Sequence, residues 1–217
     1  MIELSIMYIL NPQIEAYIEH LNRLAFIEDE AILKEMENYA YKNNFPIIDR
    51  SVGRLIYLIT RLKNPKLVVE LGSGYGYSAY YFVKAMDDGK VILTDYQEKN
   101  LEMAKSYFEQ LGVLNKVEFK IGNAIDIAKN YKDIDILFLD LEKSKYLEAI
   151  LTLKDNLKVG SLVIADNTLW YGKVVMDNPD DKTLKIREFN EYMFRNDEFY
   201  SVLIPLRDGV LVSTKIK

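Results

Sequence analysis

The chain has 217 residues, an apolar fraction of 49%, a net charge of −5, one histidine and no cysteine. This length suits one domain, or one domain with a small extension. The lack of cysteine excludes disulfides, thiolate metal sites and a cysteine nucleophile, and the single His20 excludes a multi-histidine metal site. The acidic balance, with no long basic run, weighs against a partner held by broad contact with phosphates.

The first ten residues are apolar but include Glu3 and lack a basic segment. We therefore expect neither a signal peptide nor a membrane span, and no membrane partner. A chain without cysteine is compatible with a reducing compartment, and we expect a cytoplasmic protein.

Three helices are predicted before the first strand. Asn11 and Pro12 have the form of an N-cap followed by proline at the first helical position. The second and third helices are expected at about residues 28–41 and 49–62. These helices could cover an active site, form a dimer surface, or both. Ile48, in the turn before the third helix, could lie near a ligand or only pack between helices.

From residue 67 onward, short apolar runs alternate with segments of helical spacing. Strands are expected at 67–69, 90–95, 117–121, 134–141 and 161–165, with a turn at 158–160, and helices between them, including 97–111, 144–157 and 182–196. Arg207-Asp208-Gly209 joins two final apolar runs, which predicts a hairpin of residues 199–206 and 209–216. We therefore predict an α/β fold, Rossmann-like and doubly wound, with a mostly parallel seven-stranded sheet that ends in an antiparallel hairpin. Residues 1–66 are predicted to be an N-terminal helical extension, and 67–217 the catalytic domain.

A glycine-rich turn follows the first predicted strand, with the pattern Glu70-x-Gly72-x-Gly74-x-Gly76. A strand, a glycine turn and a helix bring a ligand close to bare backbone and to the positive end of the helix. The dinucleotide pattern G-x-G-x-x-G fits only in part, because Tyr77 stands where its last glycine belongs. A tight turn without a ligand is the alternative.

Polar side chains stand at the carboxyl ends of all five predicted parallel strands. They are Glu70, Asp95, Asn123, Asp140, and Asp166 with Asn167. Ligands of open α/β sheets bind outside these strand ends, so the pattern indicates one shared crevice. Asp95 could accept hydrogen bonds from a ribose, in NAD or in S-adenosylmethionine (SAM) alike, or it could cap the following helix.

Asp140, Asp166 and Asn167 supply only hard oxygen ligands, which suit Mg²⁺, Mn²⁺ or Ca²⁺ and not Zn²⁺. Lys143 follows Asp140 by three residues, so one helical turn would bring both over the crevice. A lysine beside a cation in a desolvated site can have a lowered pKa and act as a base. A solvated surface lysine is the alternative.

With these residues the chain resembles the class I SAM-dependent methyltransferases, and among them the metal-dependent O-methyltransferases of the catechol and caffeoyl-CoA type. The resemblance runs from about residue 46 to the C-terminus. The motifs that carry it are Pro46-Ile47-Ile48-Asp49, Val69-Glu70-Leu71-Gly72 through Ser78, Asp95, Gly122-Asn123-Ala124, Asp140-Leu141-Glu142-Lys143, Ala165-Asp166-Asn167-Thr168-Leu169-Trp170, Ile186-Arg187-Glu188-Phe189-Asn190 and Asp208-Gly209-Val210.

The resemblance implies a role for each of these positions. Contact with SAM is implied for Ile48, Glu70, Gly72, Gly74, Gly76, Ser78, Asp95, Asn123, Ala124 and Asp140, with the glycines at its methionine part, Asp95 at its ribose, and Asn123, Ala124 and Ile48 near its adenine. The resemblance further implies that Asp140, Asp166 and Asn167 bind the metal. It implies a catalytic role for Lys143, together with Asp140.

The sequence departs from the family pattern at three places. Asn123 stands where the family commonly has Asp, Leu141-Glu142 replaces a smaller and more neutral pair, and Tyr171 often has a basic counterpart. The last two flank the acceptor site and bear on substrate identity. Trp170 and Tyr171 could form one wall for a flat acceptor, or could serve only in packing.

The predicted reaction is transfer of a methyl group from SAM to a metal-chelated hydroxyl. The acceptor is either a catechol-like small molecule or 5-hydroxyuridine in tRNA, because bacterial tRNA hydroxyuridine methyltransferases are similar to this chain. An NAD-dependent oxidoreductase is the alternative, but it leaves Asp140, Asp166 and Asn167 without a use. A binding protein without activity is a third possibility. The resemblance also implies a homodimer.

Overall fold

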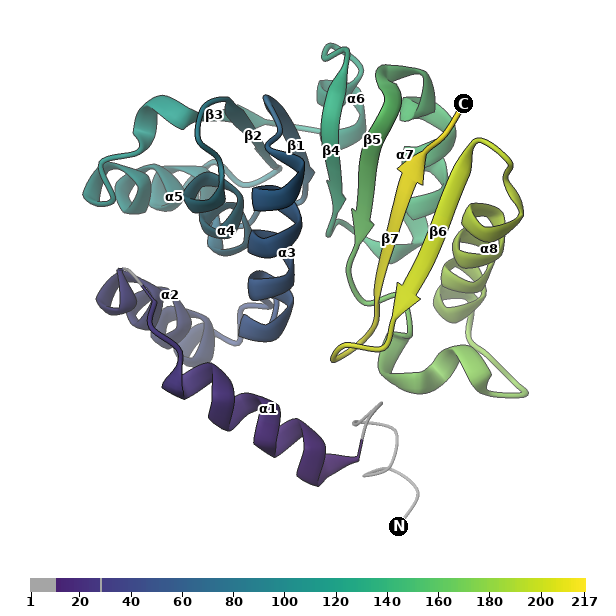
Figure 1. Ribbon diagram of the computed structural model, residues 1–217, viewed down its shortest axis with the longest axis horizontal. Helices are drawn as coiled ribbons and strands as arrows, with labels where there is room; N and C mark the ends of the chain where they lie inside the picture. Colours follow the sequence, from purple (N-terminus) through teal and green to yellow (C-terminus); the bar gives the residue numbers. More distant parts are fainter. Residues whose placement is uncertain (1–10, 28) are drawn as a thin grey trace.

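The computed structural model describes residues 11–27 and 29–217, so the predictions for the first ten residues lie outside the described residues. One seven-stranded sheet, of order β3-β2-β1-β4-β5-β7-β6, forms the centre of the molecule (Figure 1). Its strands are β1 (Leu67–Leu71), β2 (Lys90–Asp95), β3 (Val117–Ile121), β4 (Ile134–Leu139), β5 (Leu157–Ala165), β6 (Phe199–Ile204) and β7 (Val210–Lys215). The first five are parallel, and β7 runs antiparallel to both β5 and β6. The predicted α/β sheet with its C-terminal hairpin is confirmed.

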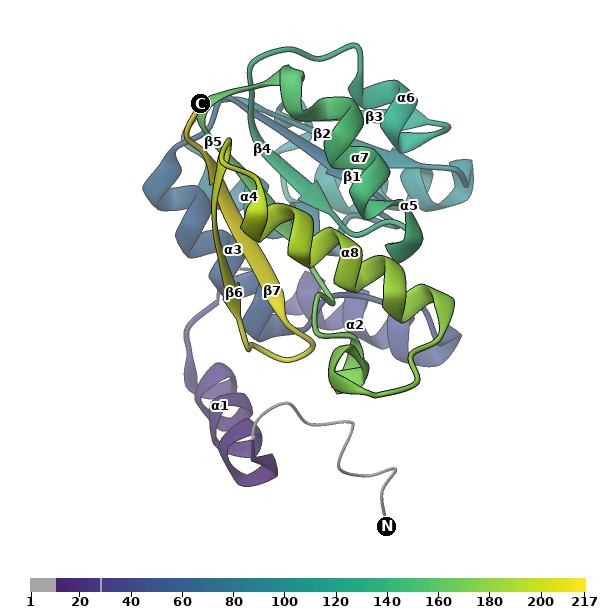
Figure 2. The same ribbon diagram turned by 90° about the vertical axis from the view of Figure 1, so that its right-hand side faces the viewer.

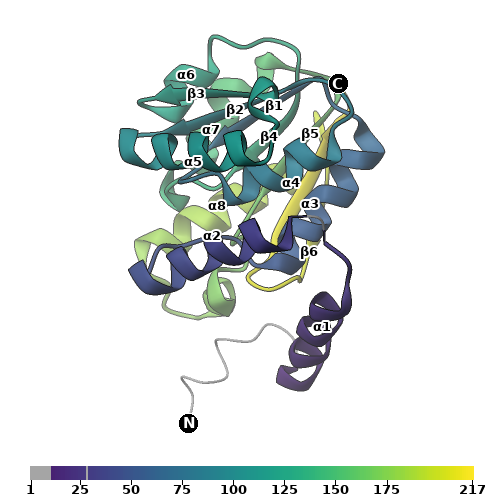
Figure 3. The ribbon, with the colours of Figure 1, turned by 90° about the vertical axis from the view of Figure 1, so that its left-hand side faces the viewer.

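Helices cover both faces of this sheet. They are α1 (Pro12–Leu24), α2 (Glu30–Asn43), α3 (Arg50–Lys63), α4 (Tyr77–Ala85), α5 (Glu98–Gln110), α6 (Ala124–Ala128), α7 (Tyr146–Leu153) and α8 (Asp181–Arg195). Figure 2 shows α7 and α8 in front of the sheet, and Figure 3 shows α2, α4 and α5 in front of the opposite face. The fold is therefore doubly wound, as predicted.

The alternation of strand residues explains the two layers of helices. Val68 and Phe138 belong to the core shared with α2 to α5, whereas their neighbours Val69 and Leu137 belong to the core shared with α6 to α8. Successive side chains of a strand point to opposite faces, so a strand that is apolar throughout fits a sheet covered on both sides.

The predicted turn at residues 158–160 is wrong, because these residues form a bulge inside β5. Ile134 pairs with Leu157, but Ile136 pairs with Leu162, so β5 carries extra residues against β4. Gly160 has a φ of +86°, and the backbone N–H of Lys158 donates to the hydroxyl of Ser161 at 3.0 Å. A bulge admits extra residues without ending the ladder.

The predicted helix at 144–157 is shortened to α7, with short 3-10 turns at Lys143–Lys145 and Lys154–Asn156. The N-cap prediction is confirmed, since Asn11 Oδ1 accepts a hydrogen bond from the N–H of Gln13 at 2.8 Å. In the described part of the chain, no helix combines the length and apolar character needed to cross a bilayer.

The helix α1 lies at the periphery, beside the β6–β7 loop (Figure 1). Its Glu15 is buried and forms an ion pair with Arg207 of that loop, at 3.1 Å. The helices α2 and α3 contribute Leu33, Val52 and other side chains to the same core as the sheet. The division of the chain at residue 66 stays a prediction.

Candidate active site

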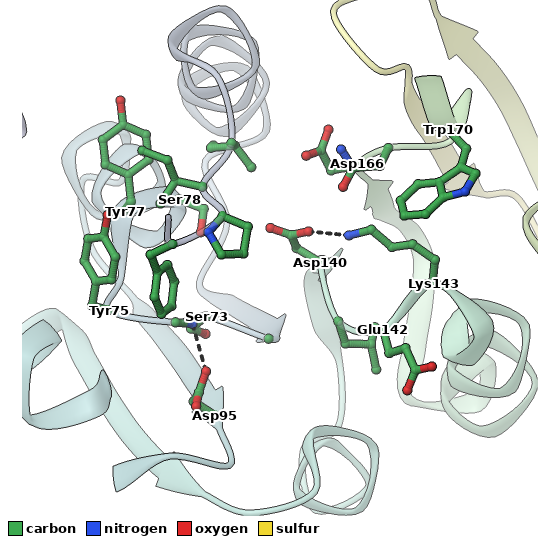
Figure 4. Close-up of a pocket in the computed structure, with 18 of the residues that line it drawn as sticks. Ser73, Tyr75, Tyr77, Ser78, Asp95, Asp140, Glu142, Lys143, Asp166 and Trp170 are labelled. Atoms are coloured by element: carbon green, nitrogen blue, oxygen red, sulfur yellow. Dashed lines mark hydrogen bonds and ion pairs between the residues drawn. The ribbon is translucent and has the colours of Figure 1, made fainter. Parts of the chain in front are cut away.

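The loops after β1, β4 and β5 and the end of β2 open into one cavity of about 440 Å³ at the carboxyl edge of the sheet. Parallel strands place their carboxyl ends at the same edge, which is why residues far apart in sequence meet here. Figure 4 shows Asp140, Lys143 and Asp166 close together, across the cavity from Ser73 and Tyr75. Of the predicted site residues, those that line the cavity are Ile48, Gly72, Gly74, Ser78, Asp95, Asp140, Lys143, Asp166 and Asn167.

The glycine turn leaves no room for side chains at two positions on the cavity wall. Gly72 has a φ of +89°, and a Cβ there would lie 2.7 Å from the backbone oxygen of Asp140. Gly74 has a φ of +51°, and its Cβ would lie 2.9 Å from the ring of Phe45. Only glycine adopts these conformations freely, so a ligand in the cavity would meet bare backbone.

The carboxylate of Asp95 holds the glycine turn and the start of α5 together. Its Oδ2 accepts from the N–H of Gly74 at 3.1 Å, and its Oδ1 accepts from the N–H of Gln97 at 2.7 Å and from the side chain of Asn100 at 3.1 Å. A carboxylate has about four acceptor positions, so it retains capacity toward the cavity.

Glu70 lies fully buried beneath the turn and does not line the cavity. Its Oε1 accepts a hydrogen bond from the hydroxyl of Ser78, and its Oε2 has no partner among the described residues. Burial raises the pKa of Glu70 to about 8, against the smaller opposing effect of the Ser78 hydrogen bond. Glu70 therefore supports the glycine turn from below. Its contact with a cofactor stays a prediction.

Three other predicted cofactor residues also lie off the cavity wall. A side chain at Gly76 would collide with the ring of Phe108 at 2.8 Å, so this glycine permits the packing of α5 against the turn. Asn123 caps α6, since its Oδ1 accepts from the N–H groups of Ile125 and Asp126. Ala124 begins the same helix. For these residues, contact with a cofactor stays a prediction.

At the other end of the cavity, Asp140 and Asp166 stand at the ends of β4 and β5. The buried hydroxyl of Tyr146 joins these ends, because it contacts the backbone oxygens of Leu139 at 2.9 Å and of Asp166 at 3.1 Å. Burial, followed by repulsion from Asp140, raises the pKa of Asp166 to about 7. Burial likewise raises the pKa of Asp140. The two carboxylates thus lie in a desolvated site, where nearby positive charge favours their ionised forms.

Lys143 supplies part of that charge, with its Nζ 2.7 Å from Asp140 Oδ1 (Figure 4). Burial acts to lower the pKa of Lys143, but the nearby Tyr146 and Asp140 outweigh burial and raise the pKa above its usual range. The lowered pKa was predicted for a lysine beside a bound cation, and it stays a prediction. The surface-lysine alternative is wrong, because the side chain of Lys143 is only 12% exposed.

Asn167 follows Asp166 with a φ of +56°, and its side-chain N–H₂ donates to Asp208 Oδ2 at 3.3 Å. Asp208 was not among the predicted site residues; the only signal for it in the sequence was its place in the C-terminal Asp208-Gly209-Val210 motif. Within residues 11–27 and 29–217, no three His, Cys, Asp or Glu side chains are arranged to hold a metal. The predicted metal set consists of two acids and one amide, so it depends on Asn167.

The outer wall of the cavity is aromatic. The rings of Trp170 and Tyr171 lie 5.4 Å apart between centroids, and Lys182 Nζ lies 6.0 Å from the Trp170 ring. Phe45 and Tyr75 also line the cavity and pack edge to face, at 4.9 Å. Phe45, Tyr75 and Lys182 were not among the predicted site residues, because their spacing carries no pattern that separates them from ordinary core or surface residues.

The chain matches the family model for O-methyltransferases over residues 25–216. The chain belongs to the O-methyltransferase family. This O-methyltransferase is similar to a caffeoyl-CoA O-methyltransferase of Medicago sativa, with 28% identity over 91% of this chain and 87% of the relative. Caffeoyl-CoA O-methyltransferase 2 of Petunia hybrida is 30% identical over 85% of this chain and 83% of the relative.

Solved structures share the fold of this O-methyltransferase. A methyltransferase from Geobacter sulfurreducens is 31% identical, with a TM-score of 0.83 over 96% of this chain and 100% of the other. The O-methyltransferase TomG from Streptomyces achromogenes, solved in complex with SAM, has a TM-score of 0.85 at 23% identity over the same shares. The predicted family, fold and enzyme class are confirmed, and the relatives named here lend no support to the oxidoreductase alternative.

Proposed function

We propose that this O-methyltransferase moves the methyl group of SAM to a hydroxyl of an acceptor held at a divalent cation, Mg²⁺ or else Mn²⁺ or Ca²⁺. The observation that carries the proposal is the pairing of two ends of one cavity. Bare glycine backbone lies at one end, and Asp140, Asp166 and Lys143 lie at the other. Such a cavity can hold a cofactor and an acceptor next to each other, which is the main requirement of a direct displacement.

The glycine end fits SAM. Gly72, Gly74 and Ser78 would hold its methionine part, Asp95 its ribose and Ile48 its adenine. All five residues line the cavity. Asn123 and Ala124, at the start of α6, would reach the adenine edge only from outside the present cavity wall. The complex of TomG with SAM supports the choice of cofactor.

The acidic end fits a hard divalent cation. Burial raises the pKa of both Asp140 and Asp166, and repulsion from Asp140 adds to the rise at Asp166. Asn167 adds an amide, so the donor set consists of oxygen atoms only. When bound, Mg²⁺ supplies positive charge that lowers the pKa of an acceptor hydroxyl and offsets both carboxylates. Burial would then be the dominant effect on Lys143, and burial lowers the pKa of a lysine. Lys143 is thus placed to take a proton from an acceptor oxygen beside Asp140.

For the acceptor we favour a catechol-like small molecule over 5-hydroxyuridine in tRNA. The relatives from Medicago sativa and Petunia hybrida are caffeoyl-CoA O-methyltransferases, and Trp170 with Tyr171 offers a flat aromatic wall. A second opening beside Asp166 is lined by Glu15, Glu19 and Asp49 against one base, Arg207. Such a border repels a polyanion. Methylation of hydroxyuridine-containing tRNA, with catechols inert, would reverse this choice.

We also propose a cytoplasmic homodimer. The apolar side chains of α1 are exposed in the single chain, with Tyr17 at 61% and Leu24 at 68%. Apolar residues gathered on one helix are typical of an interface between chains. Light scattering of the purified protein tests the dimer, and a monomer at micromolar concentration would contradict it.

Calorimetry tests the cofactor assignment directly. We expect SAM to bind and NAD to give no heat. SAM is the methyl donor that an O-methyltransferase needs, and only methyl transfer gives Asp140 and Asp166 a role. Binding of NAD without binding of SAM would overturn the proposed function.

A further inference from the structure

We infer that Asp208 is a positioning residue, which fixes the carboxamide of Asn167 so that its oxygen faces the metal. The inference rests on the proposed function, since it concerns the proposed metal ligand. Asp208 lies in the β6–β7 loop, 41 positions after Asn167. The link is therefore a product of the fold and not of local sequence.

The chemistry of the contact sets the orientation of Asn167. An ionised carboxylate can only accept hydrogen bonds, so the group of Asn167 that faces it must be the N–H₂. The distance from Asn167 Nδ2 to Asp208 Oδ2 is 3.3 Å. This contact leaves the amide oxygen for the cavity that Asn167 lines. Amide oxygen is a ligand that Mg²⁺ accepts, whereas an amide N–H₂ is not.

The other carboxylate oxygen of Asp208 holds the backbone next to this ligand. Its Oδ1 accepts from the N–H of Tyr171, and the backbone oxygen of Asp208 accepts from the N–H of Leu169 at 2.9 Å. Three residues of this segment have left-handed backbone, namely Asn167, Trp170 and Tyr171, with φ of +56°, +47° and +54°. Such conformations persist only where the surroundings hold them.

Close packing prevents the two loops from sliding past each other. A side chain on Gly209 would lie 2.5 Å from Leu169 Cγ, and the backbone oxygen of Gly209 accepts from the N–H of Thr168 at 3.0 Å. Asp208 is therefore held in register with Asn167 by backbone contacts on either side. Orienting groups of this kind typically change metal affinity by about 10- to 100-fold when they are replaced.

The test uses Asp208→Asn, Asn167→Asp and the double variant, with Mn²⁺ as the probe. In Asp208→Asn an amide N–H₂ can face Asn167, so the Asn167 carboxamide would flip and turn its own N–H₂ to the metal. We expect Mn²⁺ affinity to fall about 10- to 100-fold. In the double variant, the carboxylate introduced by Asn167→Asp can accept a hydrogen bond from the amide introduced by Asp208→Asn. Its second oxygen remains available to the metal. We therefore expect Asn167→Asp to raise Mn²⁺ affinity at least about tenfold more in the Asp208→Asn background than in the wild-type background.

Free Mn²⁺ is measured by electron paramagnetic resonance, and thermal melting shows that each variant is folded. Asp197→Asn is the matched control, because Asp197 carries the same charge on an exposed side chain paired with Lys217. Equal gains from Asn167→Asp in both backgrounds, or an Asp208→Asn variant with wild-type affinity, would overturn the inference alone. A wild-type protein that binds no Mn²⁺ would overturn the proposed metal site as well.

Discussion

Lys143 Nζ lies 2.7 Å from Asp140 Oδ1 in a largely buried ion pair, with 12% and 21% of the two side chains exposed. The pair joins the proposed base to a proposed metal ligand. Burial lowers the pKa of Lys143, while Tyr146 and Asp140 raise it more. In the proposed mechanism, a cation beside Asp140 and Asp166 would offset part of this rise, and proton transfer by Lys143 would then be coupled to occupancy of the site.

Replacing Lys143 tests this role. We expect Lys143→Met to lower kcat by about 10²- to 10⁴-fold, the usual contribution of a general base, and to leave SAM affinity close to that of the wild type. Lys145→Met is the control, because Lys145 is 50% exposed and forms its ion pair with Glu148 on the surface. Steady-state kinetics and calorimetry supply the two readings. A kcat within about tenfold of the wild-type value would contradict a role of Lys143 as the general base.

Gly72→Ala tests the glycine turn. Its Cβ would lie 2.7 Å from the backbone oxygen of Asp140, and the φ of +89° adds strain of about 1–3 kcal/mol. We expect a lower free energy of unfolding in urea and weaker SAM binding, because relief of the collision displaces Asp140. Gly112→Ala has a comparable φ of +67°, and no atom of the described residues lies within 4 Å of its Cβ, so this change reports the backbone strain alone. Equal effects of the two changes would show that the close approach to Asp140 is unimportant.

Glu70→Gln tests the buried acid through the pH dependence of stability. The pKa of Glu70 is about 8 in the folded protein against 4.5 for an ordinary glutamate. Between these values the folded state binds more protons than the unfolded state, so Glu70 costs stability as pH rises, by at most about 1.4 kcal/mol per pH unit. We expect the variant to gain stability relative to wild type from pH 5 to 8, with no further gain above that. Urea denaturation gives the free energy of unfolding of both proteins. A difference between variant and wild type that stays constant from pH 5 to 8 would contradict a raised pKa.

Apolar patterning predicted the order of strands and helices because each central strand is buried on both faces, as at Val68 and Val69. It also predicted that Asp140, Lys143 and Asp166 lie at one edge of the sheet, because the carboxyl ends of parallel strands lie at the same edge. Patterning failed at the β5 bulge, where Gly160 reads as a turn but the ladder continues on both sides.

Contacts between distant parts of the chain were beyond prediction from the sequence. Arg207 meets Glu15 across 192 positions, and Asp208 meets Asn167 across 41. In the protein alone, the direction of the Lys143 pKa shift also depends on how close Asp140 and Tyr146 lie. Sequence spacing gives the presence of such neighbours but not the distances that decide which effect is larger.

The most direct test of metal-dependent methyl transfer follows a labelled methyl group from SAM into an acceptor. The protein is incubated with labelled SAM and a small catechol, or hydroxyuridine-containing tRNA, in the presence of Mg²⁺, of EDTA, and of EDTA followed by excess Mg²⁺. We expect label in the catechol with Mg²⁺, none with EDTA, and recovery when Mg²⁺ is restored. Transfer that continues unchanged in EDTA would contradict the metal assignment of Asp140, Asp166 and Asn167.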